Sequence, residues 1–85
     1  MNIKIKGEIR FIGKDTFVDG KESNHVFKIL VIEEKDGCYL AIHCWDEKID
    51  QVKALKLGEE VEIDCRLESH RNKKNGKWFH KILVA

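Results

Sequence analysis

Apolar and polar residues alternate along the first segment of the chain, residues 3–13. Charged side chains fall on one side of an extended backbone and apolar side chains on the other. The apolar positions are Ile3, Ile5, Ile9 and Phe11. Gly7 also lies on the apolar side, where a missing side chain permits a sharp bend that helps a short sheet curl into a barrel. The pattern predicts a bent first strand, followed by a polar loop over residues 14–25.

A second run, residues 26–33, is nearly all apolar and is interrupted by Lys28. A strand that is apolar on both sides is either covered twice or presents one side to a ligand or a subunit. We predict the core positions to be Phe27, Ile29 and Val31. We predict the outer positions to be Val26, Lys28, Leu30 and Ile32. This outer face suits a base platform and a subunit interface equally well.

The dipeptide Asp36-Gly37 predicts a hairpin turn over residues 34–37, because it supplies the left-handed backbone that tight turns need. A third strand then covers residues 38–45. One face of it holds Cys38, Leu40, Ile42 and Cys44, which we assign to the core. The other face holds Tyr39, Ala41, His43 and Trp45, with Lys28 expected on the same side.

The following segment has helical spacing of apolar residues, with Asp46 as the predicted N-cap and Gly58 as the C-terminal stop. Alternation over residues 60–68 predicts a fourth strand, and a basic loop over residues 69–76 leads into a fifth strand, residues 77–84. In that last strand we place Trp78 in the core, because it alternates with Ile82 and Val84. Its neighbour Phe79 is then expected outside.

Three strands, a helix and two strands follow in the order of the OB-fold. The sequence therefore predicts an all-β protein, a five-stranded Greek-key OB-fold barrel with one helix between strands three and four. A chain of 85 residues is expected to form one domain, residues 1–85. Oligonucleotides bind such barrels across strands two and three, between the loop that joins strands one and two and the loop that joins strands four and five.

Charge is distributed unevenly along the chain, although the net charge is only +1. Residues 33–69 carry five basic and eleven acidic side chains, whereas residues 70–85 carry five basic and no acidic ones. This asymmetry indicates a polarised surface. A basic loop beside an aromatic face is the electrostatic half of a single-strand binding site, and the alternative is an ordinary solvated hairpin tip.

The three cysteines are odd in number and form no CxxC motif, which favours a reducing cytoplasm over a disulfide framework. No His or Cys pair has the spacing of zinc ligands. We find no phosphate-binding glycine loop, serine elbow or paired catalytic carboxylates. The first residues contain no continuous apolar stretch, so we expect neither a signal peptide nor a membrane span. The sequence thus predicts no metal, no cofactor and no enzymatic activity.

Several segments of the second half resemble bacterial single-stranded DNA-binding proteins and their small primosomal relatives. These segments are residues 40–45 (LAIHCW), the helix over residues 47–55, residues 56–63 (KLGEEVEI), residues 67–69 (LES) and residues 76–79 (GKWF). The similarity covers about residues 26–84. It is closer still to short bacterial OB-fold proteins with a Cys-Trp before the helix and a Trp-Phe in the last strand.

The resemblance implies that Tyr39 and Trp45 occupy third-strand positions at which these proteins stack bases. It also implies that the basic loop Arg71–Lys74 occupies the place of a DNA-contacting loop. A stacking aromatic that the relatives carry in that loop is absent here, because the matching position is near Asn72.

We therefore predict a binding module for single-stranded nucleic acid, DNA more than RNA, without strong sequence preference. The predicted contact residues are Tyr39, Trp45, His43, Lys28, Arg71, Lys73, Lys74 and Phe79. The alternative is a protein-interaction module in which Leu30, Ile32 and Trp45 bury against a partner. The apolar outer face also leads us to expect a homo-oligomer, a dimer or higher.

Overall fold

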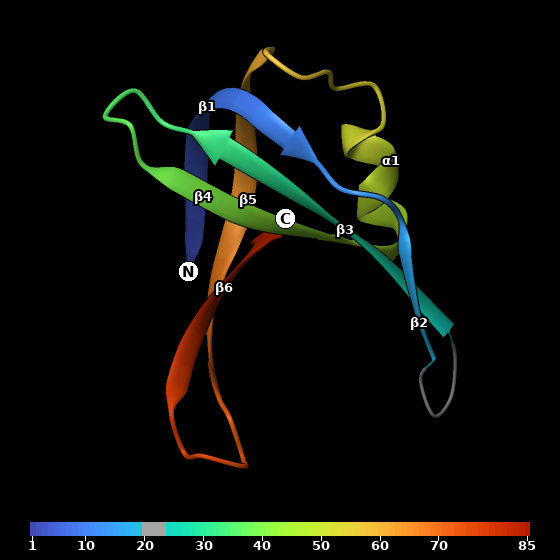
Figure 1. Ribbon diagram of the computed structural model, residues 1–85, viewed down its shortest axis with the longest axis vertical. Coiled ribbons are helices and arrows are strands. Elements are labelled where there is room, and N and C mark those ends of the chain that lie inside the picture. The colour runs from blue at the N-terminus through green and yellow to red at the C-terminus, as the bar shows by residue number, and fades with distance from the viewer. Residues whose placement is uncertain (20–23) are drawn as a thin grey trace.

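The computed structural model describes residues 1–19 and 24–85. Along these residues, six strands and one short helical segment follow one another (Figure 1). The elements are β1 (Asn2–Ile12), β2 (Thr16–Asp19), β3 (Asn24–Glu33), β4 (Tyr39–Trp45), η1 (Asp46–Lys48), α1 (Ile49–Val52), β5 (Glu60–Arg71) and β6 (Trp78–Val84). Within the described residues, no helix is long and apolar enough to cross a membrane.

Five of these strands close into a ring. β1 pairs with both β5 and β3, and the circuit continues from β5 through β6 and β4 to β3. All of these pairs are antiparallel except β4 and β6, which meet in parallel at His43 and Leu83. This is the Greek-key order of the OB-fold, with the helical segment between β4 and β5. The predicted fold class is confirmed.

A bend at Gly7 lets β1 pair with two neighbours. Its first half pairs with β5 and its second half with β3, and Glu8 lies opposite both Glu60 and Glu33. A Cβ atom at Gly7 would lie 2.3 Å from the carbonyl oxygen of Glu33. Only glycine allows the two strands to approach so closely. The bend predicted at this glycine is therefore present, and it closes the barrel.

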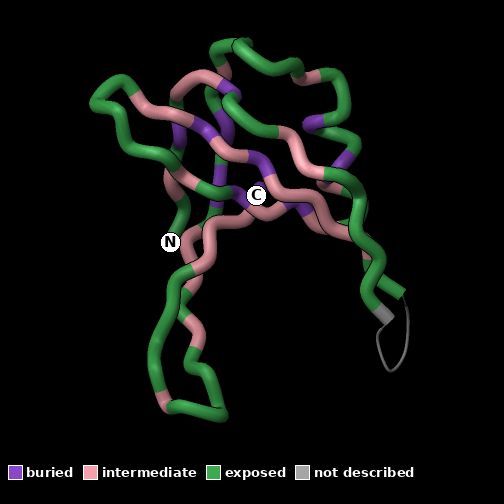
Figure 2. Tube along the Cα trace, in the orientation of Figure 1, coloured by how far each residue is buried: buried purple, intermediate pink, exposed green. Residues whose placement is uncertain are grey.

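The core fills the inside of the ring (Figure 2). Its buried side chains are Ile5, Ile9, Leu30, Ile32, Ile42, Cys44, Ile49, Val52, Ile63, Cys65 and Val84. Burial raises the pKa of the Cys44 and Cys65 thiols to about 11, so both stay protonated at neutral pH. They act as small apolar side chains.

The core face of β3 is the opposite of the predicted one. Leu30 and Ile32 are fully buried, and Val26 packs partly against the core. The outer positions are Phe27, Ile29 and Val31, which lie opposite Trp45, His43 and Ala41 of β4. The apolar outer face predicted at Val26, Leu30 and Ile32 is wrong, and the subunit contact expected there loses its basis.

The length of the hairpin loop explains this reversal. Glu33 pairs with Tyr39, so the loop contains five residues, 34–38, and Cys38 belongs to it rather than to the strand. The predicted turn contained four residues. A shift of one residue in register moves every side chain of a strand to the other face.

Two further aromatic residues predicted on inner faces lie outside the barrel. A β-bulge between Ile9 and Phe11 breaks the alternation of β1 and turns Phe11 outward, opposite Val31, where it is 52% exposed. Trp78 keeps the alternation with Ile82 and Val84, but the β5–β6 hairpin has left the barrel at this point, and Trp78 is 68% exposed.

The polar segment predicted as a loop contains a strand. β2 pairs with the start of β3, from Thr16 opposite Phe27 to Asp19 opposite Asn24. β3 therefore begins two residues earlier than predicted. The part of the predicted loop that includes Gly20 lies outside the described residues.

The helical segment starts at Asp46, as predicted, but α1 ends at Val52 rather than near Gly58. Gly58 instead has a φ of 82° and forms part of the turn into β5, where its N–H donates to the carbonyl oxygen of Ile9. The predicted N-cap at Asp46 is wrong. Trp45 holds the N-cap position, and no side chain among the described residues caps the helix there. The Asp46 carboxylate accepts a hydrogen bond from β3 instead.

Candidate functional site

Four rings form a cluster on the outer face of β3 and β4, which we call the aromatic cluster: His25, Phe27, His43 and Trp45. The ring centroids of Phe27 and Trp45 are 5.0 Å apart, and Phe27 stacks on His43 at 6.3 Å. His25 meets Trp45 edge-on at 6.4 Å. These rings support one another on a side of the sheet that the core does not use.

Asp46 fixes the cluster at the end of β4. Its carboxylate accepts a hydrogen bond from the backbone N–H of Val26 at 3.1 Å and lies 3.1 Å from Nδ1 of His25. These two contacts, the backbone one first, hold the pKa of the carboxyl below its usual range. Asp46 has a φ of 48°, a left-handed conformation that a non-glycine residue keeps only where its surroundings enforce it. Asp46 thus ties the start of β3 to the end of β4.

Lys81 of β6 extends over this cluster. Its Nζ lies 5.9 Å from the centroid of the Trp45 ring. Burial, and then the charge of Lys81, lowers the pKa of His43, so the imidazole is neutral at pH 7. Nδ1 of His43 is enclosed and has no hydrogen-bond partner among the described residues.

Tyr39 lies at the other end of β4 from the cluster. It lies six positions before Trp45, which is roughly 20 Å along a strand. Its side chain is 63% exposed, and Tyr39 lies opposite Glu33, which binds Arg10 at 2.7 Å. The structure therefore does not bring the two predicted stacking residues together.

The strands β5 and β6 continue past the barrel as a hairpin, residues 69–80, which we call the basic arm (Figure 1). Within it, Phe79 stacks on its cross-strand partner His70 at 5.6 Å. On the other face, the Oγ of Ser69 lies 3.0 Å from Nδ1 of His80. These contacts brace the arm without help from the barrel core.

The tip of the basic arm presents unpaired positive charge. Arg71, Lys73 and Lys74 are exposed, and no ion pair found among the described residues involves any of them. Trp78, 68% exposed, and Phe79, 42% exposed, project from opposite faces beside these cations. The arm therefore carries both halves of a single-strand site, charge and rings.

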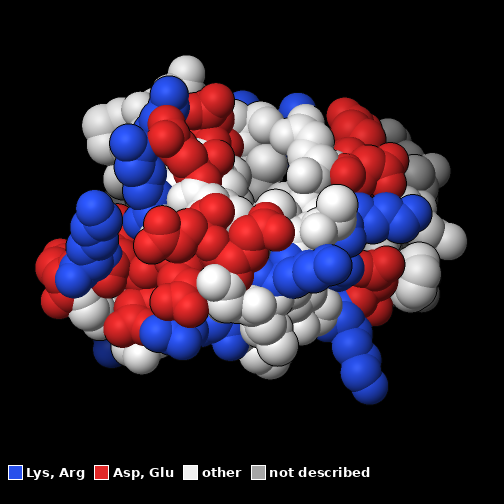
Figure 3. Space-filling view, turned by 90° about the horizontal axis from the view of Figure 1, so that it is seen from above, with Lys and Arg blue, Asp and Glu red and all other residues white. Residues whose placement is uncertain are grey.

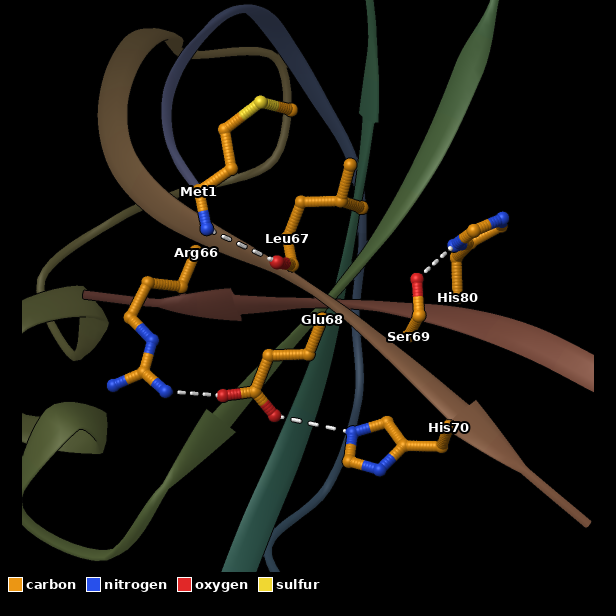
Figure 4. A network of polar contacts seen from close by, with 7 residues as sticks. All are labelled: Met1, Arg66, Leu67, Glu68, Ser69, His70 and His80. Atoms are coloured by element: carbon orange, nitrogen blue, oxygen red, sulfur yellow. Dashed lines mark hydrogen bonds and ion pairs between the residues drawn. The ribbon is translucent and has the colours of Figure 1, made fainter.

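A network of polar contacts holds the base of the arm (Figure 4). Glu68 binds His70 at 3.1 Å and also binds Arg66, and both contacts lower the pKa of the Glu68 carboxyl. The amino group of Met1 lies 3.4 Å from the carbonyl oxygen of Leu67. Because His70 stacks on Phe79, the contact with Glu68 also orients this ring pair.

The basic arm and the β2–β3 hairpin project toward the same end of the molecule (Figure 1). They correspond to the two loops that flank the ligand face of an OB barrel. Phe17 of β2 is 77% exposed on the second hairpin. The face that carries the aromatic cluster therefore has an extended hairpin at each side.

The structure brings together some of the predicted site residues and separates others. His43 and Trp45 share the aromatic cluster, and Arg71, Lys73, Lys74 and Phe79 share the basic arm. Lys28 is on the opposite side of the sheet, contrary to prediction. It pairs in register with Cys44, and its ammonium lies 3.2 Å from Asp15 with the side chain 17% exposed.

Four residues of the site were not among the predicted contacts: His25, Phe27, Trp78 and Lys81. Phe27 could have been found from the hairpin, because a five-residue loop places it on the face of Trp45. Lys81 could have been found from alternation, since it is two residues after Phe79. Trp78 gave no such signal, because its alternation with the core is real and only the length of the arm exposes it.

At the opposite end of the molecule, acidic side chains form patches beside basic ones (Figure 3). An open groove of about 910 Å³ lies between the bend of β1, the β3–β4 turn and the start of β5. Much of its charge is paired internally, with Lys4 and Lys6 on Glu62 and Arg10 on Glu33. With six acidic and four basic side chains in its lining, this end is less favourable to a polyanion than the basic arm.

Comparison with known proteins supports the fold. No protein-family model matches the chain, and no curated protein matches it at a significant level. Among solved structures, the chain is similar to a small single-stranded DNA-binding protein from Streptomyces coelicolor. The sequence identity is 14%, the TM-score is 0.51, and the match covers 100% of this chain and 87% of that one. The predicted resemblance to single-stranded DNA-binding proteins is confirmed at the level of the fold.

Proposed function

We propose that this protein binds single-stranded nucleic acid in the cytoplasm, DNA in preference to RNA, largely without sequence preference and without catalysing a reaction. The aromatic cluster on the outer face of β3 and β4 is the observation that carries this proposal. Every base has a π-face that can stack on such rings. The similar fold of a protein named for single-stranded DNA binding supports DNA as the ligand.

Trp45 is the central stacking residue. Lys81 already lies over its ring, so an incoming base has to displace this contact. A cation–π contact at an exposed site contributes about 0.5–1 kcal/mol. Stacking of a base on an aromatic side chain contributes about 1–3 kcal/mol. Stacking therefore prevails, and the displaced ammonium becomes available to a phosphate.

The basic arm supplies the second set of contacts. Arg71, Lys73 and Lys74 attract the phosphates, while Trp78 and Phe79 offer further rings on the two faces of the arm. Tyr39 provides a separate platform at the start of β4. Because the rings are spread over the surface, the strand is held at several points rather than in one enclosed pocket.

The proposal is tested by titrating labelled dT and rU oligomers in low salt while following tryptophan fluorescence in a Trp78→Phe variant. We expect a stacked base to quench Trp45 and dT to bind more tightly than rU. Trp45→Ala should weaken binding about 5- to 150-fold, the equivalent of one lost stacking contact. Leu57→Ala, which truncates an apolar side chain that is 65% exposed outside the cluster, serves as the control.

Absence of both quenching and oligomer binding at tens of micromolar protein would refute the nucleic-acid function. The apolar surface beside the cluster, formed by Phe11, Ile29 and Val31, would then favour a protein partner or a second copy of the chain. An interface of that kind tolerates salt, whereas a phosphate-binding surface does not.

A further inference from the structure

We propose that Lys81 and His43 form a phosphodiester-binding subsite inside the aromatic cluster, and that occupation of this subsite draws a proton onto His43. This inference rests on the proposed function. It places the sugar–phosphate backbone of the bound strand at a defined point of the aromatic cluster. It also couples binding to pH.

Lys81 is a cation without a carboxylate partner in the described part of the chain. Its cross-strand neighbour Glu68 is held by Arg66 and His70 instead. Lys81 is half-buried, and its ammonium lies over the Trp45 ring. A partly desolvated cation that lacks an anion is a ready site for a phosphate.

Lys81 is two residues before Leu83, which pairs with His43, and its charge adds to burial in lowering the pKa of the His43 ring. The residues that face His43 from β3 are Phe27, which stacks on it, and Ile29, its cross-strand partner, and neither of them titrates. From β6 it meets Leu83 in register and the charge of Lys81. Trp45 and Ala41 share its own face of β4. Lys81 is therefore the charged group that opposes protonation of the ring.

A phosphate at Lys81 changes this balance. Its negative charge offsets the field of the ammonium and adds an attraction for an imidazolium. The pKa of His43, which lies below its ordinary value in the free protein, then rises in the complex. A group that binds a proton more tightly in the complex makes binding tighten as pH falls. The effect develops as pH drops toward and below about 6.5, the ordinary pKa of histidine.

The test follows dT-oligomer affinity from pH 8 to pH 5.5 in the wild type, His43→Gln and His80→Gln. We expect the wild type to tighten about 3- to 10-fold more than His43→Gln over this range, since each unit of pKa gained on binding is a tenfold effect. His80→Gln removes a histidine of β6 on the face of the arm opposite Phe79 and His70, and it should keep the wild-type pH dependence.

Histidine NMR titrations give a second readout that does not depend on the folding of a His43 variant. The pKa of His43 should rise in free Lys81→Gln relative to the wild type, and it should rise in the wild type on saturation with dT. Binding of dT with an unchanged His43 pKa, or with the same pH dependence in His43→Gln, would overturn the inference and leave the proposed function standing. Failure of dT to bind at pH 5.5 in low salt would overturn both.

Discussion

At the scale of single residues, two backbone positions decide where the site lies. Gly7 lets β1 turn from β5 to β3 and so closes the barrel, whose outer face carries the aromatic cluster. Asp46, with its positive φ and its bond to the N–H of Val26, ties the end of β4 to the start of β3. Gly7 acts by lacking a side chain, and Asp46 acts through its carboxylate and its left-handed backbone.

Replacement of Gly7 by alanine tests the first of these positions. The new Cβ would meet the Glu33 carbonyl oxygen at 2.3 Å and the Ile32 side chain at 2.6 Å, so the strands have to separate. Overpacking costs roughly 1–3 kcal/mol of unfolding free energy, and we expect the top of that range or more. Urea unfolding measures it.

Gly37→Ala is the matched control, because Gly37 has a φ of 89° but open space around it. It should lose about 1 kcal/mol from backbone strain alone. Equal losses in the two variants would contradict the role assigned to the close approach at Gly7.

At the scale of elements, alternation predicts each strand of the ring but not which way every strand faces. The inner face of β4 is predicted correctly, because Leu40, Ile42 and Cys44 alternate with polar residues. In β3 both faces are apolar, so its orientation depends on one residue in the length of the adjoining loop. Sequence periodicity alone does not show whether that loop has four or five residues.

The sequence pattern likewise does not show how far the basic arm extends beyond the barrel. The alternation of β6 continues without a break from Val84 through Ile82 to Trp78, whether or not a barrel lies beneath it. Only the register of the neighbouring strands shows where the barrel ends. The rings and charges of the site were therefore largely predictable as residue types, but their grouping into a cluster and an arm required the fold.

Trp78→Ala distinguishes an arm residue from a core residue. Truncation of a buried tryptophan would cost about 3–5 kcal/mol of stability. Because the Trp78 side chain is 68% exposed on the arm, we expect the free energy of unfolding to change by no more than about 0.5 kcal/mol. Binding of a dT oligomer should weaken by about 1–3 kcal/mol if the ring stacks on a base.

Urea unfolding and fluorescence titration of the same preparation give both quantities. A large loss of stability would place Trp78 in a packed environment that the structure does not show. A normal stability with undiminished binding would remove Trp78 from the proposed contacts.

At the scale of the whole molecule, charge is separated along a body of 36 × 26 × 20 Å. The basic arm projects from one end, and the groove, whose lining has a small excess of acidic side chains, lies at the other (Figure 1, Figure 3). A net charge of +1 gives no general attraction to a polyanion. If the proposed function holds, we expect attraction to come from the arm and the field of the molecule to orient an approaching strand toward it.

Salt dependence tests this arrangement directly. Single-stranded nucleic acid releases about 0.7 counterion per neutralised phosphate, so the triple variant Arg71→Gln, Lys73→Gln, Lys74→Gln should flatten the plot of log binding constant against log salt by about 2 units. The control triple, Lys35→Gln, Lys53→Gln, Lys56→Gln, changes the net charge equally but lies outside the arm. It should keep the wild-type slope. If both triples flatten the plot alike, the protein responds to net charge rather than to a localised site, and the arm has no special part in binding.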